Sequence, residues 1–243
     1  MGRRRKTPRA TRTVVAIIQD KSGSMYNRCE ATIDGYNEYI TSLQRAAEGE
    51  MLLSLTQFDT SVKQVYSARP LMSLSTFSHE DYCPGGGTAL YDAIGRTIRE
   101  MEPAVRKDDN VLVVIMTDGQ ENSSNEWNKD GVLKLLEDKR KIGWEFVFLG
   151  AGEESWNAGV ALGFDHNHSI NYGVDAHDHQ SSYGVLVGTT NSVLRGQTAE
   201  SYLSTSTVKQ SLEHKAKNEA TPDWAGDAIV PNKAERKKYS ETV

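Results

Sequence analysis

Short apolar runs alternate with helix-like patterns through most of this chain, and this alternation restricts the possible folds more than any other feature. Residues 13–19, 51–58, 111–117 and 144–149 are rich in apolar and β-branched side chains, as strands buried on both faces are. Between them, apolar residues recur every three or four positions, as on one face of an amphipathic helix. Strands that alternate with helices predict an α/β fold with a mostly parallel sheet.

The first helix pattern shows how the connections follow from the sequence. Its apolar positions are Cys29, Ile33, Tyr36, Ile40, Leu43 and Ala47, and Gly49 ends it. The strand at 51–58 is followed almost at once by a second strand-like segment at 61–66. So short a connection leaves no room for a crossover, so this pair should be antiparallel. With a short last strand at 169–172, we expect a doubly wound, Rossmann-like sheet of six strands, one of them an antiparallel edge strand, with helices on both faces.

Charge divides the chain into three parts. Residues 1–12 hold six Arg and Lys and no acid, residues 13–196 hold 26 acids against 15 bases, and residues 197–243 hold seven of each. We therefore expect a disordered basic arm (1–12), one domain (13–196) and a polar C-terminal helix and tail (197–243). The acidic domain should repel nucleic acid. The arm could bind nucleic acid or another anionic surface, or it could be only a solubilising tail.

Nothing in the sequence indicates a membrane protein or a secreted one. The longest apolar run, residues 111–116, is far too short to span a bilayer, and no secretory leader is apparent. Cys29 and Cys83 are too few for a disulfide framework or a zinc site, so a reduced, cytoplasmic chain is expected. We expect two buried thiols, with a redox-linked bridge as the alternative.

Three short polar segments stand at strand or helix ends. Residues 20–24 read Asp-Lys-Ser-Gly-Ser, residues 85–88 read Gly-Gly-Gly-Thr, and residues 117–119 read Thr-Asp-Gly. Right-handed crossovers place the strands at 51–58 and 111–117 on opposite sides of the first strand. Asp20 and Asp118 should then flank the crevice where open α/β sheets bind ligands. We expect both carboxylates at the surface rim, with Thr88 entering beside them.

The side chains brought together in this way carry only hard oxygen ligands. Two carboxylates (Asp20 and Asp118) and three hydroxyls (Ser22, Ser24 and Thr88) match the preferences of Mg²⁺ or Mn²⁺, and the lack of soft ligands argues against zinc. The alternative is a set of polar caps at strand-to-helix turns.

The three segments, in this order, resemble the signature of the von Willebrand factor A (vWA) domain over residues 13–196. The sequences at 34–37, 87–93 and 119–122 are similar to those of stand-alone bacterial and phage members. The resemblance implies an intact metal-ion-dependent adhesion site (MIDAS). In such a site the three hydroxyls bind Mg²⁺, the two Asp bind it directly or through water, and a partner protein's Asp or Glu fills a free position. The implied function is Mg²⁺-dependent protein–protein interaction.

Neighbouring residues should ring the ion and select the partner. We expect this rim to consist of Met25, Tyr26, Asn27, Arg28, Tyr91, Gln120, Glu121 and Asn122. A metal-dependent hydrolase is the alternative from another class. It is disfavoured because Ser22 stands where a phosphatase would carry a second Asp, and the three segments contain no His to act as a base. We therefore expect neither enzymatic activity nor a small-molecule substrate.

Four histidines form a separate feature outside the three segments. His166, His168, His177 and His179 form two His-x-His pairs. Zinc is conceivable there, but the spacing matches no closed structural zinc site. We interpret this segment as a polar loop before the last helix.

Overall fold

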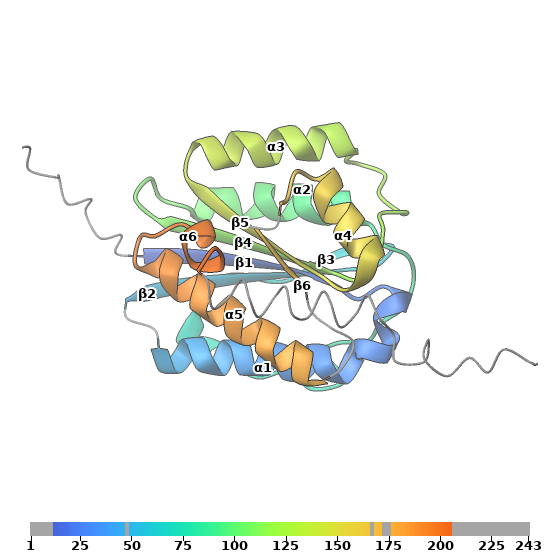
Figure 1. Ribbon diagram of the computed structural model, residues 1–243, viewed down its shortest axis with the longest axis horizontal. Helices are drawn as coiled ribbons and strands as arrows, with labels where there is room; N and C mark the ends of the chain where they lie inside the picture. The colour runs from blue at the N-terminus through green and yellow to red at the C-terminus, as the bar shows by residue number, and fades with distance from the viewer. Residues whose placement is uncertain (1–11, 47–48, 166–167, 172–175, 206–243) are drawn as a thin grey trace, which may run out of the picture.

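The computed structural model describes residues 12–46, 49–165, 168–171 and 176–205 (Figure 1). This part of the chain forms one six-stranded sheet with the order β3-β2-β1-β4-β5-β6. All neighbouring strands are parallel except β2 and β3, which pair antiparallel at one edge. The predicted fold class is confirmed, including the single antiparallel edge strand.

In the described part of the chain, α-helices cover the sheet in two layers. The strands are β1 (Arg12–Asp20), β2 (Glu50–Phe58), β3 (Val62–Pro70), β4 (Asn110–Thr117), β5 (Trp144–Gly150) and β6 (Ser169–Asn171). The α-helices of the described residues are α1 (Cys29–Ala46), α2 (Leu90–Met101), α3 (Lys129–Lys141), α4 (Gly152–Ala161), α5 (Ala176–Leu194) and α6 (Ala199–Leu203). Short 3₁₀ helices are η1 (Gly23–Arg28), η2 (Leu71–Ser73) and η3 (Glu102–Ala104). Figure 1 shows α2, α3 and α4 on one face, with α1 and α5 on the other.

The hydrophobic core lies on both faces of β1 and β4. In β1, Val15 and Ile17 pack in the cluster that contains α1 and α5, whereas Val14 and Ile18 pack in the cluster that contains α2 and α3. Side chains of a strand alternate between its faces, so a strand covered on both sides must be apolar throughout. This requirement explains the uninterrupted apolar runs at the centre of the sheet.

The boundaries of the packed domain differ slightly from the predicted ones. Arg12 belongs to β1: its side chain is 6% exposed, and its Nε donates to Asp109 at 3.0 Å. At the other end, Ala199 and Leu203 of α6 are buried in the same cluster as α5. The packed fold therefore begins one residue earlier and continues beyond residue 196. The rest of the predicted arm and most of the tail lie outside the described residues, so the predictions for them stay predictions.

The edge strand β3 is longer than the sequence indicated. It continues to Pro70, past the predicted end at residue 66, with shifts in its register against β2 and a positive φ of 44° at Ala68. Proline is tolerated there because an edge strand has no ladder partner on its outer side.

Within the described ranges, no helix is both long and apolar enough to cross a membrane.

Candidate metal site

The candidate site lies at the carboxyl ends of the two central strands. Asp20 is the last residue of β1, and Asp118 follows the last residue of β4. Because β1 and β4 pair in parallel, with Gln19 opposite Met116, both carboxylates are at the same edge of the sheet. The switch point of the strand order thus positions them as predicted.

Asp20 is buried, which corrects our prediction that it lies on the surface rim. The side chain is 0% exposed, Oδ1 accepts the backbone N–H of Ser22 at 2.6 Å, and Oδ2 accepts the hydroxyl of Thr117 at 2.5 Å. Burial raises the pKa of Asp20 to about 6, and these hydrogen bonds offset only part of that effect. The nearby negative charge of Asp118 adds to the increase in the pKa.

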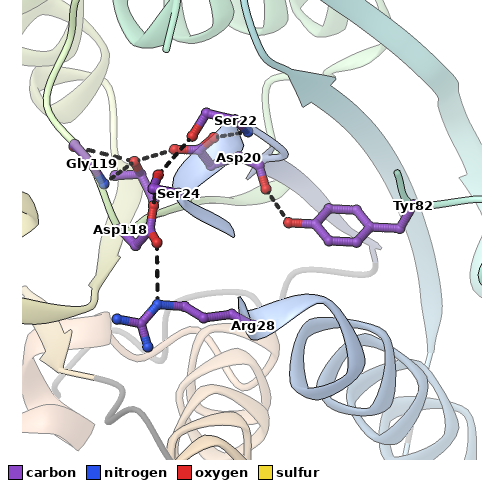
Figure 2. A network of polar contacts seen from close by, with 8 residues as sticks. Asp20, Ser22, Ser24, Arg28, Tyr82, Asp118 and Gly119 are labelled. Atoms are coloured by element: carbon purple, nitrogen blue, oxygen red, sulfur yellow. Dashed lines mark hydrogen bonds and ion pairs between the residues drawn. The ribbon is translucent and has the colours of Figure 1, made fainter. Parts of the chain in front are cut away.

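A chain of short contacts joins the neighbouring hydroxyls to Asp118. The hydroxyl oxygens of Ser22 and Ser24 lie 3.1 Å apart, and Ser24 donates to Oδ1 of Asp118 at 2.6 Å (Figure 2). On the other side of Asp118, Nε of Arg28 donates to Oδ2 at 3.2 Å. Four of the five predicted ligands are thus brought together by direct contacts along residues 20–24 and at residue 118.

Thr88, the fifth predicted ligand, reaches the same point from the glycine-rich loop. A Cβ atom at Gly119 would lie 3.5 Å from the hydroxyl oxygens of both Ser24 and Thr88, so these hydroxyls converge. The Thr88 side chain is almost fully buried, and no hydrogen bond of its hydroxyl occurs among the described residues. Two backbone hydrogen bonds, from Gly23 to Gly86 and from Gly85 to Lys21, fasten this loop to the first segment.

Two of the expected rim residues instead hold the loops in place. Oδ1 of Asn122 accepts the backbone N–H of Thr88 at 2.8 Å. The carboxylate of Glu121 accepts four hydrogen bonds, from the N–H groups of Tyr91, Ser123 and Ser124 and from the Ser124 hydroxyl. Both residues line the hollow above the site, but their polar atoms are largely committed to residues 88–91 and 122–124.

Met25 does not lie on the rim, so that prediction is wrong. Its side chain is 1% exposed and packs with Ile33 and Tyr82. By contrast, Tyr26 is 73% exposed on the same 3₁₀ helix. Asn27 and Gln120 are also exposed, whereas Tyr91 and Arg28 are half-buried.

Sequence reasoning missed Tyr82. Its hydroxyl donates to the backbone carbonyl of Asp20 at 2.5 Å, and its ring is buried (Figure 2). Tyr82 therefore holds the backbone of Asp20 from the side opposite Asp118. It lies in a long connection without periodic pattern, so no feature of the sequence marked it.

The donor set fits a hard divalent cation. A half-open hollow of about 420 Å³ lies over it. Its lining residues are Ser22, Gly23, Ser24, Gly86, Gly87, Thr88, Gly119, Gln120, Glu121 and Asn122. Four of these are glycines, which leave room beside the hydroxyls, and the donors are hydroxyl and carboxylate oxygens, as Mg²⁺ and Mn²⁺ prefer.

The two cysteines and the four histidines are the remaining candidate residues of the sequence. Cys83 is exposed and Cys29 half-buried, both as free thiols, so the prediction of two buried thiols is wrong for Cys83.

His166 lies outside the described residues, as do the side chains of His177 and His179, while Nδ1 of His168 lies 2.8 Å from Oδ1 of Asp165. Among the described residues, no group of three or more His, Cys, Asp or Glu could hold a metal ion.

Comparison with known proteins shows the fold. No protein-family model and no curated protein matches the sequence. The vWF domain of the type V pili tip protein Mfa5 from Porphyromonas gingivalis matches with a TM-score of 0.58 and 11% identity, over 76% of this chain and 96% of that chain. The PilB minor pilin from Streptococcus sanguinis matches with a TM-score of 0.57 and 11% identity, over 79% of this chain and 63% of that one.

A third similar structure is proximal thread matrix protein 1 from the mussel byssus. It matches with a TM-score of 0.56 and 16% identity, over 73% of this chain, which spans about half (47%) of that protein. Another structure of the same mussel protein, with a TM-score of 0.54, has a zinc-occupied MIDAS motif. The chain therefore has the doubly wound α/β fold of vWA domains.

Proposed function

We propose that this protein binds a partner protein through a divalent cation, Mg²⁺ or Mn²⁺, held by Asp20, Ser22, Ser24, Thr88 and Asp118. The observation that carries the proposal is the convergence of three hydroxyls and two carboxylates under a half-open hollow. A cation bound there supplies positive charge and an open coordination position for the carboxylate of a partner's Asp or Glu. The zinc-occupied MIDAS motif of the mussel protein supports divalent metal binding by this fold.

The residues of the site leave the open coordination position to an anionic group of the partner, because no further carboxylate among the described residues of the site is free to fill it. In the described part of the site, the carboxylates within the contact chain are Asp20 and Asp118, whose two charges balance those of a divalent ion. The other acidic residue of the lining, Glu121, accepts four hydrogen bonds from its own loop and from α2. An incoming carboxylate would therefore meet little opposing charge.

We also propose that the site is not catalytic. The described lining of the hollow contains no His, Cys or Lys, and the hydrogen bonds to Glu121 leave it poorly placed to act as a general base. Incubation with p-nitrophenyl phosphate and Mn²⁺ should give no turnover above buffer. Turnover that disappears when the Thr88 hydroxyl is removed would support the hydrolase alternative instead.

The metal part of the proposal is tested by Thr88→Val. Valine keeps the shape of threonine and removes a hydroxyl that has no hydrogen-bond partner among the described residues, so the fold should be unaffected. Loss of one neutral ligand should weaken Mn²⁺ binding roughly tenfold, as isothermal titration calorimetry would measure. Proteins captured from a native lysate in Mg²⁺ should be released by EDTA and should bind this variant less. Thr41→Val, on α1, is the matched control, and equal Mn²⁺ affinities of the two variants would contradict the proposal.

Tyr26 should contribute to partner binding without contributing to metal binding. Its side chain is 73% exposed on the 3₁₀ helix η1, which immediately precedes α1. Exposed aromatic side chains often anchor protein interfaces. Tyr26→Ala should weaken partner binding roughly tenfold, with Mn²⁺ affinity and thermal stability unchanged. Met72→Ala is a suitable control: Met72 is equally exposed but follows β3 at the opposite end of the sheet. Similar partner affinity of both variants would place the interface elsewhere.

A further inference from the structure

Arg28 is a cation in direct contact with one of the two carboxylates of the proposed metal site, that of Asp118. It is the last residue of the 3₁₀ helix η1 and immediately precedes α1. Its Nε donates to Oδ2 of Asp118, the carboxylate oxygen opposite the one that accepts the Ser24 hydroxyl (Figure 2). The arginine side chain is only 15% exposed and that of Asp118 only 5%, so water screens their interaction weakly.

Helix dipoles give no net reason for an arginine at this position. Arg28 ends η1, where a positive charge is favourable, and precedes α1, where it is unfavourable because the dipole of α1 is positive there. Burial of the guanidinium adds a desolvation cost, and Nη1 is buried without a hydrogen-bond partner among the described residues. The contact with Asp118 is the interaction that the structure offers in return.

That contact changes the charge of the site. Asp20 and Asp118 together carry two negative charges, and Arg28 reduces the sum to one. The other nearby cation, Lys21, which lies between Asp20 and Ser22 in the sequence, forms an ion pair with Asp59 and is neutralised there. Compared with the same site lacking Arg28, a divalent ion is therefore attracted less, and an anion approaching the loaded site is attracted more.

We infer that Arg28 is a specificity-determining residue: it weakens binding of the cation alone and strengthens binding of a partner's carboxylate to the cation-loaded site. The inference rests on the proposed function. It implies that the site holds its ion loosely until an acidic partner completes the coordination. It also makes anionic groups the preferred partners over neutral ones such as an amide or a hydroxyl.

The test compares Arg28→Gln with the wild type. A unit charge about 6 Å from a divalent ion changes its binding roughly tenfold even at the dielectric constant of water, and changes that of a single carboxylate roughly threefold. By calorimetry at low salt, Arg28→Gln should therefore bind Mn²⁺ roughly tenfold more tightly than the wild type. With Mn²⁺ saturating, it should bind the blocked peptide acetyl-Gly-Asp-Gly-amide roughly threefold more weakly. Water-proton relaxation of the bound Mn²⁺ would report the peptide.

Three further variants make the outcome decisive. Arg28→Lys keeps the charge and should stay close to the wild type, and Arg28→Met is a second neutral variant that should repeat the result of Arg28→Gln. Arg45→Gln removes an exposed charge from the last turn of α1 and should change neither affinity. Equal Mn²⁺ affinities of the wild type and both neutral variants would overturn the role of Arg28 alone. Absence of Mn²⁺ binding from every protein, the wild type included, would overturn the proposed function and this inference with it.

Discussion

Replacement of Asp20 by Asn is expected to abolish Mn²⁺ binding and, at the same time, to stabilise the metal-free protein at pH 7. The carboxylate is fully buried, and burial raises its pKa from 3.8 to about 6. At neutral pH the metal-free protein therefore contains an ionised Asp20, and the folded state would be more stable if this carboxylate were neutral. The difference corresponds to about 3 kcal/mol at about 1.4 kcal/mol per pKa unit.

An asparagine can satisfy the hydrogen bonds that Asp20 now makes. Its carbonyl oxygen can accept the N–H of Ser22, and its amide can donate to the hydroxyl oxygen of Thr117. That hydroxyl can then turn towards the carbonyl of Gly119, which lies 3.4 Å away. The substitution thus removes a buried charge and keeps a hydrogen-bond partner for both the oxygen and the nitrogen atom of the side chain.

The pH dependence of stability follows with a definite sign. Because the pKa of Asp20 is higher in the folded than in the unfolded protein, its stabilising contribution is complete below about pH 4 and is lost as the pH rises through about 6. Most other shifted carboxyls act in the opposite direction. Hydrogen bonds from Ser78, for example, lower the pKa of Asp81.

Urea denaturation in EDTA between pH 4 and 7.5 would measure the effect. The stability difference between Asp20→Asn and the wild type should grow as the pH rises from 4 to about 6 and then level off, whereas Asp81→Asn should show no such growth. Mg²⁺ should then stabilise the wild type and not Asp20→Asn, because a ligand stabilises only the state that binds it. An Asn variant less stable than the wild type at pH 7 in EDTA would contradict the burial argument.

The regular elements were predictable because their periodicity follows directly from burial. Both faces of β1 and β4 are covered, so each is apolar throughout, and the buried side of α1 repeats every three or four residues. That the five candidate ligand residues come together was predictable for a related reason. Each lies at or near the end of a strand or helix, and crossover handedness fixes how these elements are arranged.

The parts that the sequence did not indicate depend on contacts between distant segments. Met25 turns inward because η1 packs against Tyr82, which is 57 residues further along the chain (82 − 25). Glu121 and Asn122 hold residues 88–91 in place through hydrogen bonds that exist only when the segments around residues 88 and 121 are both folded. The ion pair of Arg28 with Asp118 likewise joins residues 90 positions apart. No local pattern encodes such pairs.

Gly35→Ala is expected to destabilise the protein by about 3 kcal/mol, the upper part of the range for an overpacked core. Gly35 is buried in α1. Figure 1 shows α1 and α5 packed on the same face of the sheet. A Cβ atom there would stand 1.9, 2.3 and 2.5 Å from three ring atoms of Tyr183, which is only 2% exposed. The ring cannot move aside within a close-packed core, so the two helices would have to separate.

Gly184→Ala provides the matched control, since it makes the same chemical change in the partner helix. Gly184 is exposed in α5, and a Cβ atom there would meet nothing within 4 Å. Alanine should therefore stabilise α5 by about 1 kcal/mol through its helix propensity. Urea denaturation should give shifts of opposite sign for the two variants. Adding Tyr183→Leu to Gly35→Ala should recover part of the loss, because residues in contact are not additive. A Gly35→Ala protein as stable as the wild type would mean that α1 and α5 lie further apart than this fold places them.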